Sequence, residues 1–135
     1  MLNTMIDPRM KGRFAETIAA DHLITMGWKV LARNVKISHG ELDIVALDTT
    51  IRPGELVIVE VRARTIGKIQ SPLESVGPRK LKSLVKYSRA LVEKVSWEKF
   101  WRIDLIGITF EDKISFQKWR LDHVKDITAG RDIYS

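Results

Sequence analysis

The spacing of apolar residues along the chain predicts two amphipathic helices and five strands. Apolar side chains recur every three or four positions over residues 9–26 and 79–94, which is typical of helices packed on a core. Alternating or nearly continuous apolar runs predict strands at 28–34, 41–47, 56–63, 101–110 and 114–121. The run at 56–63 is the most apolar, as expected for a central strand buried on both faces. This order of elements predicts an α/β fold in which helices cover a central mixed sheet.

The segments between these elements carry turn and loop signals. Asp7 followed by Pro8 is typical of a helix start, and Gly27 of a helix end. Residues 65–78 hold two Gly and two Pro and predict a loop, with one helical turn near 73–76. A length of 135 residues fits one domain. We expect that domain to cover residues 1–122 and a polar, loosely held tail to cover 123–135.

The chain is basic and contains no cysteine. It has 23 Lys and Arg against 17 Asp and Glu, a net charge of +6 and a pI near 9.7. Such a balance favours a polyanionic partner such as nucleic acid, although many small proteins are basic for solubility alone. The absence of cysteine excludes disulfides and thiolate metal sites. With no apolar run of membrane length and no secretory leader pattern, we expect a cytoplasmic protein without a membrane partner.

Four charged residues interrupt the apolar pattern. Glu16 borders the apolar stripe of the first helix, Asp43 lies in mid-strand, and Glu60 and Arg62 follow the apolar run of the central strand. Each has an ordinary explanation by itself. Glu16 would pair with a nearby arginine such as Arg13, Asp43 would cap backbone groups after a turn, and Glu60 would form an ion pair at a strand end.

Taken together, the three acids predict a metal site. They are expected near one sheet, where like charges repel one another unless a cation joins them. Oxygen ligands without cysteine favour Mg²⁺ or Mn²⁺ over Zn²⁺. The pattern therefore predicts a divalent cation held by Glu16, Asp43 and Glu60.

The same residues resemble a known nuclease motif. Asp43, sixteen intervening residues and then Glu60-Val61-Arg62 resemble the PD-(D/E)xK motif of restriction-endonuclease-like nucleases. A longer set of segments, in order over residues 12–110, is similar to the UPF0102 (YraN-like) family. These segments are Gly12-Arg13-Phe14-Ala15-Glu16, Leu31-Ala32-Arg33-Asn34, Gly40-Glu41-Leu42-Asp43, Val59-Glu60-Val61-Arg62-Ala63-Arg64, Pro72-Leu73-Glu74-Ser75-Val76 with Lys80, and Arg102-Ile103-Asp104.

The resemblance implies a restriction-endonuclease-like three-layer fold and a Mg²⁺-dependent endonuclease that selects substrate structure rather than sequence. It implies that Asp43, Glu60 and the carbonyl of Val61 hold the metal, with Glu16 as a further ligand. Arg62 stands where the motif has Lys; arginine stays protonated and so would hold the phosphate rather than act as a base. Two more acids in the similar segments, Glu41 and Glu74, are expected to support the ligands.

A basic stripe on the second helix offers a docking surface for phosphates, with DNA favoured over RNA. The residues expected to bind nucleic acid are Arg64, Lys68, Arg79, Lys80, Lys82, Lys86 and Arg89. A solvated polar face explains the same stripe equally well. Two further functions stay open: an inactive or weakly active nucleic-acid-binding protein of nuclease fold, and an assembly subunit whose basic helix binds protein. Homodimerisation also stays open.

Overall fold

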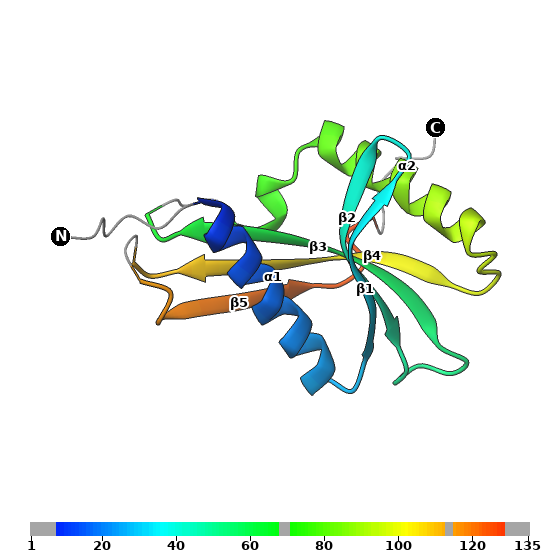
Figure 1. The fold of residues 1–135 in the computed structure, drawn as a ribbon, viewed down its shortest axis with the longest axis horizontal. Coiled ribbons are helices and arrows are strands. Elements are labelled where there is room, and N and C mark those ends of the chain that lie inside the picture. Colours follow the sequence, from blue (N-terminus) through cyan, green and yellow to red (C-terminus); the bar gives the residue numbers. More distant parts are fainter. Residues whose placement is uncertain (1–7, 68–70, 113–114, 129–135) are drawn as a thin grey trace.

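A computed structural model describes residues 8–67, 71–112 and 115–128 of the chain and shows a sheet with one long helix on each face (Figure 1). The elements in chain order are α1 (Pro8–Thr25), β1 (Lys29–Ile37), β2 (Gly40–Asp48), β3 (Glu55–Thr65), the short 3₁₀ helix η1 (Leu73–Ser75), α2 (Pro78–Lys94), β4 (Trp101–Phe110) and β5 (Trp119–Val124). The two predicted helices are confirmed to within about a residue at each end.

The five strands form one mixed sheet in the order β1-β2-β3-β4-β5. Neighbouring strands are antiparallel except β3 and β4, which run parallel. Parallel neighbours need a long crossover, and the segment containing η1 and α2 supplies it. The prediction of an α/β fold with a mixed sheet between helices is therefore confirmed, and β3 is its central strand.

Each helix covers its own face of the sheet, so the protein has two apolar cores. The α1 core joins Ala15, Ala19 and Leu23 to Ile44, Val57, Val59, Ile106 and Ile108. The α2 core joins Leu81, Leu84, Val85 and Leu91 to Leu56, Ile58, Ile103 and Leu105. The alternation along β3 sends odd-numbered residues to α1 and even-numbered residues to α2, as its sequence predicts. Neither long helix in the described ranges has the length and apolar composition to cross a membrane.

Two sequence-based expectations about boundaries are wrong. The last strand was predicted at 114–121 but begins at Trp119 and ends at Val124, because its register is set by pairing with β4. Residue 114 lies outside the described residues. The predicted tail also begins too early: His123 belongs to β5, and Ile127 is buried in the α2 core. Residues 129–135 of that tail lie outside the described residues.

The alternation expected along β2 fails at Asp43. Ile44 and Ala46 face α1, but Leu42, two residues before Ile44, packs with Val45 on the α2 side. The change coincides with the end of the pairing between β2 and β3, since their ladder runs only from Asp48–Glu55 to Ile44–Val59.

Beyond the end of that ladder, a side chain replaces the partner strand. The backbone N–H of Val61 donates to Oδ2 of Asp43 at 2.8 Å. The open end of the β2–β3 ladder thus places a carboxyl group against exposed backbone of the central strand.

Candidate active site

Asp43 on β2 and Glu60 on β3 form a carboxyl pair at the open end of the ladder. Glu60 is only 4% exposed and Asp43 is partly buried. Burial, the charge of Glu60 and a side-chain hydrogen bond to Glu60 together raise the pKa of Asp43 to about 7. A hydrogen bond between two carboxyl groups needs one proton, and its raised pKa lets Asp43 keep that proton up to about pH 7.

Two cations from different elements lie beside Glu60. Nε of Arg62 on β3 and Nζ of Lys80 on α2 are each 3.5 Å from Oε2 of Glu60. These distances suit ion pairs but are longer than strong hydrogen bonds. Nε of Arg62 is buried and has no hydrogen-bond partner among the residues that the structure describes. A buried donor without a partner is costly, so the site favours a further acceptor at Arg62.

Glu16 is held by partners that the sequence did not suggest. Its Oε1 accepts hydrogen bonds from Nε of Arg33 at 3.1 Å and from Nδ2 of Asn34 at 2.9 Å, both on β1. The alternative of an ion pair between Glu16 and an arginine is therefore confirmed, but the arginine is Arg33 and not Arg13. The described part of the chain holds no group of three or more His, Asp or Glu spaced to bind one ion. The expected cluster of three acids is thus present only as the pair Asp43 and Glu60.

Glu16 and Asp43 nevertheless line one cavity of about 290 Å³. Its lining comes from α1, from β1 and β2, and from Val61 of β3. The lining residues are Arg9, Gly12, Arg13, Glu16, Asn34, Glu41, Asp43 and Val61. Asn34 adopts a left-handed backbone conformation with φ of 53°, which asparagine tolerates better than most residues. This conformation is part of the irregular backbone that carries its side chain to Glu16.

The remaining predicted residues are spread around this site. Those exposed on α2 are Arg79, Lys80, Lys82, Lys86 and Arg89, as the stripe indicated. Arg64 on β3 is partly buried, and its Nε donates to Oγ1 of Thr109 at 3.1 Å. Glu41 is exposed at the cavity, whereas Glu74 is exposed on η1 and does not line it. Lys68 lies outside the described residues.

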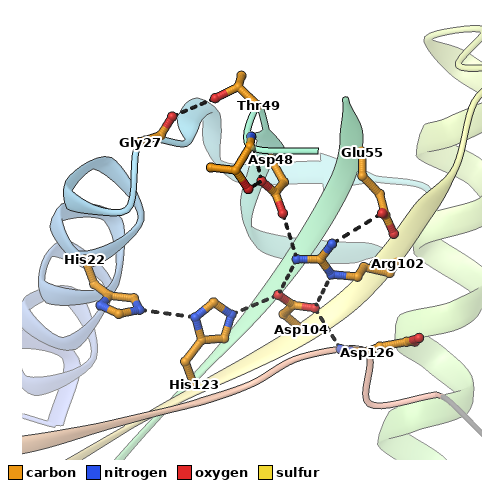
Figure 2. A network of polar contacts seen from close by, with 10 residues as sticks. His22, Gly27, Asp48, Thr49, Glu55, Arg102, Asp104, His123 and Asp126 are labelled. Atoms are coloured by element: carbon orange, nitrogen blue, oxygen red, sulfur yellow. Dashed lines mark hydrogen bonds and ion pairs between the residues drawn. The ribbon is translucent and has the colours of Figure 1, made fainter. Parts of the chain in front are cut away.

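A second polar cluster lies on the α1 face, around a fully buried carboxylate (Figure 2). Asp104 on β4 accepts from Nε of Arg102 at 2.9 Å, from Nε2 of His123 at 2.8 Å and from the N–H of Asp126 at 2.9 Å. Burial alone would raise the pKa of Asp104, but the hydrogen bonds from His123 and Arg102 outweigh it and lower that pKa. Nε2 of His22 on α1 lies 3.1 Å from Nδ1 of His123, and this hydrogen bond connects α1 to the cluster.

This buried cluster connects β2, β3, β4 and β5, the strands beside which α1 packs. Arg102 also reaches Asp48 and Glu55, each at 3.4 Å, so the ends of β2 and β3 are joined to β4. The zero exposure of Asp104 and its ion pair with Arg102 indicate a structural role. The histidines share no sequence spacing, and only the fold brings them together.

Comparison with known protein families identifies the chain. The model of the uncharacterised protein family UPF0102 matches residues 15–108. The chain belongs to UPF0102. The matched segment includes Glu16, Asp43, Glu60 and Arg62, whereas Arg9 precedes it.

Two curated UPF0102 relatives align over most of their own length. The UPF0102 protein of Chlorobium chlorochromatii is 34% identical over 119 residues, which cover 85% of this chain and 88% of the relative. That of Chlorobaculum parvum is 35% identical over 123 residues, covering 87% and 91%. Among solved structures, Pyrococcus furiosus SfsA in complex with Ca²⁺ is similar with a TM-score of 0.33 and 14% identity, covering 89% of this chain and 64% of SfsA.

Proposed function

We propose that this protein is a Mg²⁺-dependent endonuclease of restriction-endonuclease-like fold that hydrolyses phosphodiester bonds in nucleic acid. The observation that carries the proposal is the Asp43–Glu60 pair, which keeps a proton to near pH 7 at the open end of the β2–β3 ladder. Two acids held this close favour a cation that can replace the proton. The nearby arginine and lysine suit a phosphate, which is the charged group of the proposed substrate.

The oxygen atoms around the pair suit Mg²⁺, or Mn²⁺ in its place. Asp43 and Glu60 would hold the ion together with the backbone carbonyl of Val61. In a strand the N–H and C=O of one residue point to the same edge, and the N–H of Val61 already points to Asp43. Glu16 would join only after leaving Arg33 and Asn34, so we assign it a supporting role. When bound, the ion would activate a water molecule and polarise the phosphodiester.

The protein's own side chains supply the remaining parts of the reaction. Arg62 cannot accept a proton from water, because a guanidinium stays protonated at any relevant pH. Its Nε, which makes an ion pair with Glu60 but no hydrogen bond with the described residues, can instead donate to a phosphate oxygen and stabilise charge that develops at phosphorus. Lys80 provides a second positive charge from α2. Hydrolysis adds water across one P–O bond and leaves a phosphate monoester and a hydroxyl group.

A second candidate is a nucleic-acid-binding protein that keeps the nuclease fold with little or no turnover. The observation that favours it is that Arg62 stands where the motif has lysine and lies, with Lys80, beside Glu60. Salt-sensitive binding without cleavage would support this candidate.

A cleavage assay on labelled DNA and RNA tests both candidates. Substrates should include single strands, duplexes, flaps and four-way junctions, each with Mg²⁺, Mn²⁺ or EDTA. We expect cleavage that needs the metal and disappears in Asp43→Asn and Glu60→Gln. Asp122→Asn, a surface residue paired with Arg120, serves as the charge-matched control and should cleave as the native protein does. Absence of cleavage of every substrate with both metals would refute the endonuclease.

A further inference from the structure

Gly12 in α1 has no structural reason to be glycine. A Cβ built at this position meets no atom within 4 Å, and Gly12 is not among the glycines with positive φ. Gly40 and Gly107 differ, because a Cβ there would strike Tyr87 or Pro72. Glycine inside a helix is less stable than alanine, since it loses more backbone freedom on folding. The chain therefore carries a helix-weakening residue where its own packing would accept a larger one.

The bare backbone at Gly12 faces the cavity that Glu16 and Asp43 line. Arg9, Gly12, Arg13 and Glu16 follow helical spacing on one side of α1, and all four line that cavity with Asp43. Arg13 is exposed and forms no hydrogen bond or ion pair with the described residues. Two guanidinium groups thus border a stretch of helix that has no side chain.

We propose that Arg9, Gly12 and Arg13 form a subsite for the sugar–phosphate backbone of the nucleic acid. Arginine binds phosphate through two parallel hydrogen bonds, and glycine lets a ligand approach the helix backbone closely. The subsite rests on the proposed function and adds to it the path of the substrate, which crosses α1. The basic stripe at Lys82 and Lys86 lies on α2, which covers the opposite face of the sheet.

Substitutions at Gly12 separate this subsite from a purely structural role. Gly12→Ala and Gly12→Leu should raise the urea midpoint of unfolding, because both favour helix and meet no atom. Gly12→Leu should nevertheless weaken binding of a fluorescent 20-nucleotide DNA by about tenfold or more in EDTA, because its side chain fills the path. A variant that is more stable yet binds less would not arise from damaged folding.

Substitution of Arg13 tests the subsite independently of Gly12. Arg13→Ala should weaken binding of the same DNA about tenfold and reduce the slope of log affinity against log salt by about one. Gly77→Leu and Lys99→Ala are the matched controls. Gly77 is also exposed with an open Cβ position, and neither residue lines the cavity. Parallel titrations with a single-stranded DNA, a duplex and an RNA of the same sequence identify which backbone is preferred.

The outcomes distinguish the subsite from the proposed enzyme. Native binding and salt slope in Gly12→Leu and Arg13→Ala would overturn the subsite, even if Asp43→Asn abolished cleavage. Weakened binding in both variants, with no cleavage by the native protein, would support the subsite and refute the endonuclease. If Gly12→Leu failed to fold, Gly12→Ala and Arg13→Ala would decide the question.

Discussion

Replacing Asp43 by asparagine should stabilise the protein, and more so at alkaline than at acidic pH. Asparagine keeps the shape of the protonated acid: its amide can donate to Glu60 while its oxygen accepts from the N–H of Val61. It removes the ionisation that the site disfavours. A raised pKa in the folded state means that the fold binds more protons than the unfolded chain, so stability falls as pH rises from about 4 to about 7.

The size of the effect follows from the two pKa values of Asp43. With a pKa of 3.8 in the unfolded chain and about 7 in the folded protein, linkage gives a cost of about 4 kcal/mol at pH 8. The same relation gives a cost of about 2 kcal/mol at pH 5. The advantage of Asp43→Asn over the native protein should therefore grow by about 2 to 3 kcal/mol between pH 5 and pH 8.

Urea denaturation in EDTA at the two pH values measures this difference directly. Subtracting the native curve at each pH cancels every other titrating group. Glu41→Gln is the matched control, because Glu41 is exposed at the same cavity and loses the same charge. We expect that control to stay within about 0.5 kcal/mol of the native protein. An Asp43→Asn advantage that does not change with pH would refute the shared proton.

Three further substitutions test the framework of the fold by urea denaturation. Asp104→Asn should lower the free energy of unfolding by about 3 kcal/mol, because its buried arginine partner loses a counter-charge; a loss below about 1 kcal/mol would contradict this. Gly40→Ala should cost about 1 to 3 kcal/mol because its Cβ meets the ring of Tyr87, whereas Gly77→Ala has open space; equal costs would contradict that packing. Burial and nearby positive charge lower the pKa of His22, so native stability should fall as pH drops below about 6.5. His22→Gln should flatten this fall, and an unchanged pH profile would argue against it.

Local signals were enough to predict the framework of this fold. The helices follow from the 3.6-residue period, and β3 follows from its apolar run, because both patterns reflect burial against one face or two. The last strand was misplaced because its position depends on pairing between Phe110 and Trp119, which no local pattern encodes. The start of the tail was missed for the same reason, since Ile127 is buried only by tertiary contacts.

The candidate site was predictable where charges interrupt strands. Asp43 and Glu60 break apolar strands and do meet, as their sequence positions indicated. The partners of Glu16 were not predictable, because Arg33 and Asn34 on β1 reach Glu16 only when α1 packs against the sheet. The role proposed for Gly12 was not predictable from the apolar pattern, because a missing side chain leaves no signal there.

The central claim is that a divalent cation replaces the proton shared by Asp43 and Glu60. Calorimetric titration with Mg²⁺ and Mn²⁺, in buffers of different ionisation enthalpy, counts the protons released for each ion bound. With the pKa of Asp43 at about 7, we predict release of about one proton at pH 6 and almost none at pH 8, with binding lost in Asp43→Asn. Equal proton release at both pH values, unchanged binding in Asp43→Asn, or no binding at millimolar metal would contradict the claim.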